Sequence, residues 1–591
     1  MKNITLLITF LLLSVIKIYA FDQSDPPVVV TGTVKDTKGN PLPGVTVTVT
    51  GSKTGTQTGT DGSFRINASA NATLKFSFIG YGEQTIPLNG RNNLAVTLTE
   101  TTTALNDVIV VGYGTQKKVN LTGAVVTVNS AELNKRVVTN PATMLQGKLP
   151  GLTVVENSGE PGNQGISLRV RGQGTYSGAG NDPLVIVNGI PGNLSALNPN
   201  DIESVTVLKD AASASIYGTR AANGVILVTT KKGAKEGLQL EYSYNMGITS
   251  PTRMLKLITN SVEYMELYNK ALVHSGQAAA YPASFIDLYR NPTDKEQYPN
   301  INWLDILFRT TYVQNHYLNV SGGRSGTNYT VGMGMTDEPG TMLGFENKKY
   351  TLQFNLTSEV NKRVTFGANM NFNYNARKYP RQGSQDQFLA ALSQAPMYGP
   401  IVPDGSGHYT FRGDPYTYHN KNPVAIAENV QATDRAYYLQ SNLFVNVKVL
   451  EGLSWETRGG FNFSFNKVKD FRPVIPQYDW FTGEFTTNLD VGTKGLVVTD
   501  NNNIYPVIYT QLTYDKQLGH HNLKVLAGAQ EEYFKQEGLT GYRRDFPGNE
   551  LHEINAGGPD GQTAGGEAYE WSLRSYYGRL NYDYNDKYLF E

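Results

Sequence analysis

From residue 234 onward, the chain alternates apolar and polar residues with a period of two. In residues 238–248, one face of an extended strand carries Leu238, Leu240, Tyr242, Tyr244, Met246 and Ile248. The opposite face carries Gln239, Glu241, Ser243, Asn245 and Gly247. Residues 350–357 and 364–375 repeat this alternation. Because successive side chains of a strand point to opposite sides, each segment predicts a strand with one apolar and one polar face.

The connections between these strands alternate between long and short. We place strands near 238–248, 312–323, 327–336, 348–359, 362–376, 434–448, 453–466, 505–516, 521–533, 572–584 and 587–591. Long connections fall at 249–311, 377–433, 467–504 and 534–571, and short ones such as "RSG" and "VNK" separate them. A soluble β-sandwich has no reason for such alternation, whereas a transmembrane barrel has tight turns at one rim and long loops at the other. Residues 234–591 are therefore expected to form part of an outer-membrane β-barrel.

The final segment, residues 587–591, reads as an interrupted strand. Each unpaired backbone group in lipid costs on the order of several kcal/mol, so an open sheet edge is not viable there. We therefore expect the chain to be the N-terminal part of a longer protein, truncated within a barrel of about 22 strands, whose lumen is wide enough to require a plug.

Residues 27–100 predict a small β-sandwich. Short strand signals such as "VVVTGTVKD", "SFRIN" and "LAVTLTE" are separated by turn sequences such as "TKGNPLPG" and "TDGS". About seven strands at this spacing are typical of two packed sheets. We expect this unit to be a spacer with its own core.

Residues 116–233 predict a small α/β domain. A helix is expected in "TNPATMLQGKLPG", with Asn140 or Thr139 as its cap and Pro141 at its first position. A second short helix, "DAASASIYG", has Asp210 as its cap and Gly218 as its end. The wholly apolar "PLVIVNG" predicts a buried strand. The segment "GQGTYSG" lacks the spacing of a dinucleotide-binding loop, so that function is not expected.

A run of β-branched residues lies in the linker between these two domains, residues 101–115. Its sequence "DVIVVGYG" comprises Asp107, Val108, Ile109, Val110, Val111, Gly112, Tyr113 and Gly114. It could be a core strand of a neighbouring domain, but neither neighbour needs it. We favour an exposed strand that a partner extends through main-chain hydrogen bonds.

Composition excludes several classes of function. The chain has 51 basic and 51 acidic residues, so no nucleic-acid partner is expected. It has no cysteine, and its seven histidines lack metal-ligand spacing, so neither disulfides nor a metal site is predicted. No nucleophile–base pairing is evident, so we expect neither enzyme activity nor a cofactor. The basic start and short apolar stretch of residues 1–20 predict a signal peptide.

Two sets of residues are candidates for binding or mechanics. Arg169 and Arg171 in "RVRG" are expected to pair with carboxylates of the barrel wall and hold the plug. The alternative is that these ion pairs must break when the plug is pulled, which would make the two arginines a latch. Aromatic residues in the long loops suit stacking on sugars or packing on peptides. These ligand candidates are Tyr409, Phe411, Tyr416, Tyr418, Tyr478, Trp480 and Phe481. Some of these aromatics could instead belong to a membrane-interface girdle.

Several motifs resemble known families. The segments "GTVKDTKGNPLPGVTVTV" and "TDGSFRI" resemble the carboxypeptidase-regulatory-like domain, a β-sandwich without peptidase activity. The segments "NPATMLQGKLPGLTV", "PLVIVNGIPG" and "LNPNDIESVTVLKDAASASIYGTRAANGVILVTTKKG" resemble the plug domain of TonB-dependent receptors, and more narrowly the SusC/RagA group. The chain departs from this pattern at Asn188, where the family more often has Asp.

The resemblance implies a function and a set of partners. It implies an outer-membrane importer of glycan oligosaccharides or peptides that works with a SusD-like surface lipoprotein. Residues 107–114 would be the TonB box, through which TonB and its ExbB–ExbD motor act. The sandwich and plug would lie on the periplasmic side, and membrane lipid would surround the barrel. The alternatives are a surface polymer-binding protein or adhesin without transport, and a siderophore receptor.

Overall fold

The computed structural model describes most of the chain after the first 27 residues. The described residues are 28–50, 52, 54–78, 81–99, 124–176, 180–234, 236–411, 421–489, 493–585 and 587–591, with the backbone of 108–111 and 114–117. The predicted signal peptide lies outside them. The chain divides into two compact units, residues 1–107 and 108–591. Among the described residues, no helix has both the length and the apolar character needed to span a membrane.

The first unit is the predicted β-sandwich. Within its described residues the strands are β1 (Val28–Asp36), β2 (Thr46–Val49), β3 (Gly55–Gln57), β4 (Ser63–Ala68), β5 (Thr73–Ser77), β6 (Gln84–Pro87) and β7 (Asn93–Leu98). They form two sheets, ordered β4-β1-β7 and β3-β2-β5-β6. Alternate side chains such as Val34, Phe64, Leu74 and Phe76 fill the space between the sheets. The seven strands expected from the turn spacing are confirmed.

The plug begins the second unit and centres on a five-stranded sheet. The strand order is β10-β15-β16-β13-β14. The bounds are β10 (Val125–Asn129), β13 (Leu184–Val187), β14 (Ile190–Pro191), β15 (Ile202–Leu208) and β16 (Val225–Thr230). A separate hairpin joins β11 (Leu152–Glu156) and β12 (Ile166–Val170). Apolar residues of β15 and β16, among them Val205, Val207 and Val228, form the core with Leu145 and Leu152.

Short helices surround this sheet. They are α2 (Ser130–Leu133), η2 (Pro141–Leu145), η3 (Leu194–Ala196), η4 (Pro199–Asp201), α3 (Ala211–Ala214) and η5 (Ser215–Ala221). Asn140 is the cap of η2, where its Oδ1 accepts a hydrogen bond from the Ala142 N–H over 3.0 Å. The helix expected here is thus a single 3-10 segment. Asp210 caps α3 as predicted, and Gly218 with φ +66° interrupts η5.

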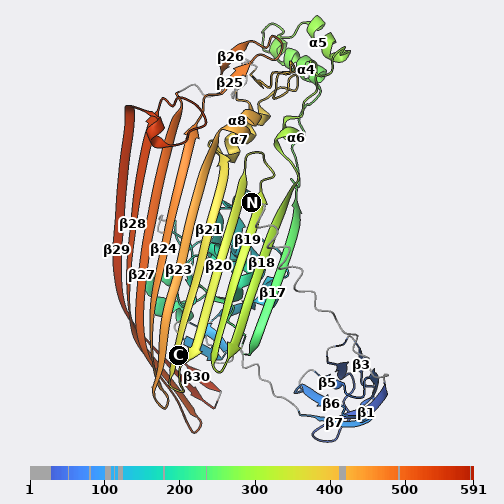
Figure 1. The fold of residues 1–591 in the computed structure, drawn as a ribbon, viewed down its shortest axis with the longest axis vertical. Helices are drawn as coiled ribbons and strands as arrows, with labels where there is room; N and C mark the ends of the chain where they lie inside the picture. The colour runs from blue at the N-terminus through green and yellow to red at the C-terminus, as the bar shows by residue number, and fades with distance from the viewer. Residues whose placement is uncertain are drawn as a thin grey trace, which may run out of the picture. The chain divides into compact units, whose positions relative to one another are not determined.

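The rest of the second unit is a long antiparallel sheet, which we call the wall (Figure 1). Within the described residues its eleven strands follow chain order, and each pairs with the next. They are β17 (Gly237–Thr249), β18 (Thr311–Arg324), β19 (Thr327–Pro339), β20 (Glu346–Glu359), β21 (Val364–Pro380), β23 (Gln431–Leu450), β24 (Leu453–Arg472), β27 (Gly495–Leu518), β28 (His521–Arg544), β29 (Gly558–Tyr584) and β30 (Tyr588–Phe590). All eleven predicted strands are present.

Several wall strands are longer than predicted at the long-loop rim. The segment 495–504 belongs to β27, and the segments 534–544 and 558–571 belong to β28 and β29. The segments 534–544 and 558–571 are rich in Gly and charged residues and lack an apolar face, and in 495–504 the apolar run of residues 496–498 followed by Asp and Asn breaks the alternation. The hydrogen-bonded ladder continues through them without the alternation on which the sequence prediction depended.

The wall has a polar inner face and an apolar outer face. Asn442 and Asn462 are 3% and 6% exposed, whereas their neighbours Leu443 and Phe461 are 58% and 40% exposed. A soluble protein buries apolar side chains and exposes polar ones. This wall does the reverse, which is the arrangement of a barrel surrounded by lipid.

The long connections fold into a loop assembly at one rim of the wall (Figure 1). It contains α4 (Ser261–His274), α5 (Ala283–Arg290), α6 (Trp303–Leu307), α7 (Gly383–Leu392), α8 (Pro423–Asn429), β22 (Tyr409–Thr410), β25 (Pro476–Tyr478) and β26 (Phe485–Asn488). An aromatic core with Trp303, Tyr398 and Trp480 packs α4, α5, α6 and α7 together, and a second apolar cluster contains Ile426 of α8 and Ile475. The long connections therefore form one folded surface rather than separate irregular loops.

Candidate functional site: the interface between plug and wall

A buried carboxylate of the plug contacts the first part of the wall. Asp201, at the end of η4, is 2% exposed. Tyr317 of β18 donates its hydroxyl to Oδ1 of Asp201 over 2.6 Å, and Asn319 donates to the Tyr317 hydroxyl over 3.3 Å. A Cβ atom at Gly332 of β19 would lie 2.3 Å from the same Oδ1. The plug therefore fits closely here because position 332 has no side chain.

Replacing Gly332 by valine is expected to push the plug away from the wall. The added side chain overlaps Asp201 and Tyr317, and overpacking of this kind costs about 1–3 kcal/mol. Thermal unfolding of the full-length protein in detergent should show a lower Tm. Gly459→Val on β24 is the matched control, because a Cβ atom there meets no described atom within 4 Å. Equal Tm values for both variants would contradict the close fit at Gly332.

Asp201 should also make stability depend on pH. Burial raises the pKa of its carboxyl from the ordinary 3.8 to about 7, although the Tyr317 hydrogen bond and the charges of Lys231 and Lys349 favour ionisation. The folded protein then binds this proton more tightly than the unfolded chain, so stability falls as pH rises from about 4 to 7. Asp201→Asn keeps the hydrogen-bond acceptor without the charge. It should flatten the dependence of Tm on pH and raise Tm at pH 8.

Strand β20 of the wall holds the plug by further hydrogen bonds. The Lys349 ammonium donates to the backbone oxygens of Ser195 and Leu197 over 2.8 and 3.0 Å. Asn198 donates its amide to Thr351 Oγ1 over 3.0 Å. These contacts anchor the plug segment around η3 and η4 to β20.

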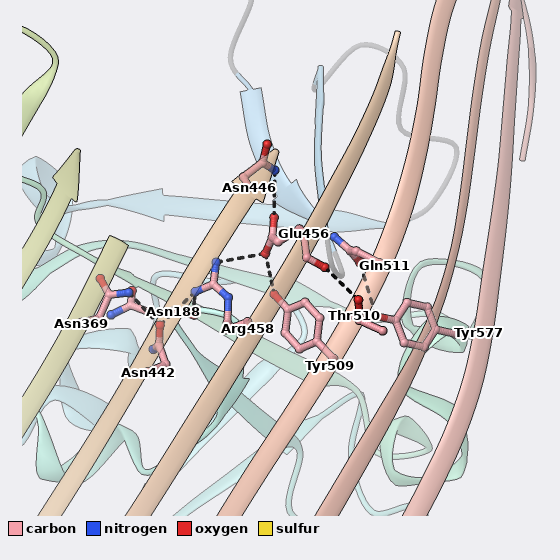
Figure 2. A network of polar contacts seen from close by, with 10 residues as sticks. All are labelled: Asn188, Asn369, Asn442, Asn446, Glu456, Arg458, Tyr509, Thr510, Gln511 and Tyr577. Atoms are coloured by element: carbon pink, nitrogen blue, oxygen red, sulfur yellow. Dashed lines mark hydrogen bonds and ion pairs between the residues drawn. The ribbon is translucent and has the colours of Figure 1, made fainter. Parts of the chain in front are cut away.

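Farther along the wall, Arg458 of β24 lies at the centre of a second polar network between plug and wall (Figure 2). Its Nη1 donates to the backbone oxygen of Asn188 in the plug over 2.6 Å and to Oδ1 of Asn442 over 3.1 Å. Its Nη2 lies 3.2 Å from Oε1 of Glu456, which also accepts the Tyr509 hydroxyl over 2.9 Å. The network fixes the guanidinium against the tip of the β13–β14 hairpin.

That hairpin turns at Asn188 and Gly189, whose φ angles are +50° and +90°. Asn and Gly are favoured in two-residue turns with two positive φ angles. The Asn188 side chain donates Nδ2 to Thr230 Oγ1 over 2.8 Å and accepts from the Thr230 N–H over 3.0 Å. The Asn188 amide thus joins the turn to β16 through both of its polar atoms.

A buried ion pair joins the plug to the far part of the wall. Arg220 of η5 donates Nη1 and Nη2 to the two carboxylate oxygens of Glu532 over 2.7 and 2.5 Å. The Glu532 side chain is fully buried, and Gln530 and Tyr505 also donate to it. Two parallel bonds of this kind are the strongest arrangement an arginine and a carboxylate can adopt.

The predicted latch residues lie elsewhere. Arg169 is on β12, and its buried Nη1 has no hydrogen-bond partner among the described residues. Neither Arg169 nor Arg171 forms an ion pair with a carboxylate in the described part of the wall. The predicted pairing is therefore not observed, and Arg220 is the arginine that makes a bidentate contact with the wall. Sequence reasoning missed it because "YGTRAANG" carries no sign of what Arg220 faces.

The predicted partner-binding strand forms a hairpin in the structure. Its residues 108–111 are β8, which pairs antiparallel with β9 (Gly114–Lys117). Asp107, Gly112 and Tyr113 and the side chains of the hairpin lie outside the described residues. One edge of β8 is occupied, so a partner strand must use the other edge or displace β9. Its role as the TonB box stays a prediction.

Among the predicted ligand aromatics, Trp480 is 4% exposed and belongs to the core of the loop assembly. Its indole Nε1 donates to the Gln297 backbone oxygen over 2.9 Å. Phe481 packs edge-on against Phe285 at 5.6 Å. Neighbouring side chains bury the Trp480 ring, so the prediction that Trp480 contacts a ligand is wrong for this structure.

The other aromatic candidates lie nearer the surface of the loop assembly. The Tyr409 hydroxyl donates to Glu428 over 2.6 Å. Tyr478 stacks on His408 with ring centres 3.8 Å apart, and the Phe411 N–H donates to the Tyr478 backbone oxygen. Tyr416 and Tyr418 lie outside the described residues. Ligand contact by these residues stays a prediction.

Among the cavities between plug and wall, two lie toward opposite rims of the wall. The first, of about 320 Å³, faces the loop rim and is lined mainly by amides, hydroxyls and aromatic rings. Its lining includes Asn193, Asn347, Asn373, Asn375, Ser464, Asn466, Tyr437 and Tyr438. The second, of about 400 Å³, adjoins Arg458 and the β13–β14 hairpin near the short turns. Different plug residues line the two cavities, so the plug lies between them.

Comparison with known proteins identifies the family. Residues 117–225 match the TonB-dependent Receptor Plug Domain, and residues 30–110 match the CarboxypepD_reg-like domain. The whole chain is 31% identical to the TonB-dependent receptor SusC of Bacteroides thetaiotaomicron, and the match covers 57% of that protein. The chain belongs to the SusC/RagA family of TonB-dependent receptors. Membership of this family implies an outer-membrane protein.

Other relatives agree with this assignment. The receptor is 30% identical to the TonB-dependent receptor P3 of Formosa agariphila over 95% of its own length and 53% of that protein. The RagAB peptide importer in its open-open state has the same fold, with a TM-score of 0.69, 23% identity, and coverage of 81% of this chain and 55% of that one. The receptor chain therefore spans about half the length of the relatives it matches, and those relatives are receptors or importers rather than enzymes.

Proposed function

We propose that this chain is the plug-bearing part of a TonB-dependent importer of glycan oligosaccharides or peptides. The observation that carries the proposal is the inverted polarity of the wall, with Asn442 and Asn462 buried beside exposed Leu443 and Phe461. Such a wall suits lipid outside and polar cargo inside. The plug blocks the route, so passage of a large solute requires the plug to move.

The proposed source of work is TonB, which acts through residues 107–114 with its ExbB–ExbD motor. A short strand of β-branched residues suits extension by a partner strand. A SusD-like surface lipoprotein is the proposed partner at the loop assembly. The sandwich and plug are assigned to the periplasmic side.

The cavity toward the loop rim is the proposed place of substrate contact. Its two charged groups, Glu338 and Lys349, are already engaged by neighbouring polar groups. Amides, hydroxyls and the rings of Tyr437 and Tyr438 remain to contact a ligand. Such a lining suits sugar rings and peptide backbones alike.

Energy dependence tests the proposal. Cells that express the full-length protein are given panels of fluorescein-labelled oligosaccharides and oligopeptides, with and without a protonophore. We expect at least one panel to be internalised, and the protonophore to stop internalisation while surface binding persists. Binding without internalisation in either condition would favour the alternative of a surface polymer-binding protein.

A further inference from the structure

The start of the plug is tied to the residue that caps α3. Ala124 is the first described residue after the segment 118–123, which connects it to the β8–β9 hairpin. Its N–H donates to Oδ2 of Asp210, and its backbone oxygen accepts from the Lys209 N–H over 3.3 Å. Any pull that enters along the chain from residues 107–114 therefore reaches Asp210 before strand β10 separates.

Asp210 uses its other oxygen inside the plug. Oδ1 accepts from the Ser213 N–H over 2.8 Å and from the Ser213 hydroxyl over 2.6 Å, which caps α3. Burial alone would raise the pKa of Asp210, but the bonds from Ser213 and Ala124 lower it below its ordinary value. The carboxylate is therefore charged at neutral pH, and both of its oxygens are in use.

The helical segment that follows connects Asp210 to the wall. Ala214, Tyr217 and Ala221 pack together with Leu208 and Leu227 in one apolar cluster. A packed cluster moves as a unit more readily than it deforms. The far end of this segment carries Arg220, which holds the buried carboxylate of Glu532.

We propose that Asp210 is a positioning residue that transmits a pull on the start of the plug, through α3 and η5, to the Arg220–Glu532 ion pair. The inference rests on the proposed function in one respect, that the pull comes from TonB. The Ala124–Asp210 contact brings α3 away with β10, and the same displacement withdraws Arg220 from Glu532. Without the Ala124–Asp210 contact, β10 separates from β15 while α3 stays in place, and the Arg220–Glu532 ion pair remains intact.

Single-molecule pulling tests this path without TonB, so its outcome is separate from whether the protein is an importer. The full-length protein is held in a lipid nanodisc and pulled through a cysteine introduced by Thr103→Cys, since the chain has no native cysteine. The readout is the rate of the first plug rupture at constant force. Asp210→Asn retains a helix cap but cannot accept bonds at both positions. Ala124→Pro removes the donor of the same bond at a strand start, where proline is tolerated.

The two variants should each raise the first rupture rate by about ten- to hundred-fold, the usual worth of one hydrogen bond to a charged group. Glu532→Gln should speed rupture in the wild-type background and have no effect on the first rupture when combined with Asp210→Asn. Glu160→Gln is the control, because Glu160 pairs with Arg377 of the wall at 3.5 Å and lies outside this path. Its effect should be the same in both backgrounds. Independent effects of Glu532→Gln and Asp210→Asn would overturn the proposal, as would unchanged rupture in Ala124→Pro and Asp210→Asn.

Discussion

Deleting residues 107–114 is expected to reduce uptake of labelled substrate to the level of cells that lack the protein. The deletion removes β8, the strand that we propose a partner extends, and leaves the described plug and wall residues intact. Surface binding of the same substrate should persist, because the deletion leaves the loop assembly and the cavity toward the loop rim unchanged. Uptake and binding are measured together by quenching surface fluorescence.

Two controls separate the strand from the linker. Replacing residues 101–106 by glycine and serine keeps the length of the linker and should leave uptake unchanged. Val110→Pro removes one main-chain donor from β8 and should reduce uptake nearly as far as the deletion. If uptake survived the deletion, the proposal that force enters through this segment would fail.

Replacing Glu532 by alanine is expected to loosen the plug. The change leaves the Arg220 guanidinium without its buried carboxylate. Breaking such a pair costs about 3 kcal/mol, at the lower end of its range, because Arg220 keeps 29% of its side chain exposed. The urea midpoint for plug release should fall, and cells should become more permeable to vancomycin.

Glu531 provides a matched control one residue away on β28. Its side chain is 55% exposed on the outer face and pairs with Arg574 over 3.0 Å. Because this pair lies on the face turned away from the plug, Glu531→Ala should leave the plug in place. Similar permeability of the two variants would show that the inward pair does not hold the plug.

Local patterning was enough to predict most of the fold. In β17, the alternation of Leu238, Leu240 and Tyr242 with polar residues gave the strand and its apolar face, and those three side chains are 71%, 72% and 61% exposed. The pattern failed where strands extend beyond the apolar band, as in residues 558–571, because both faces there are polar. Caps such as Asp210 were predictable because the acceptor and the helix it caps are adjacent in sequence.

Contacts between plug and wall were much less predictable. Arg220 and Glu532 are 312 residues apart, and only the docking of two elements brings them together. The inward position of Glu532 among neutral residues such as Gln530 was a usable signal, since a charge on that face needs a partner. The role of Trp480 was also beyond the sequence, because an aromatic residue in a long loop can either contact a ligand or pack in the core of the loops. Only the folded loop assembly distinguishes the two.

The central claim, that lipid surrounds a wall whose polar face is turned inward, is tested most directly by spin labels at neighbouring positions of β23 and β24. Single cysteines are introduced by Leu443→Cys and Phe461→Cys on the apolar face and by Asn442→Cys and Asn462→Cys on the polar face, and the labelled protein is reconstituted in lipid. We predict that oxygen, which concentrates in the lipid, relaxes the labels at 443 and 461 strongly and those at 442 and 462 weakly. Equal relaxation at all four positions, or stronger relaxation at 442 and 462, would contradict the account.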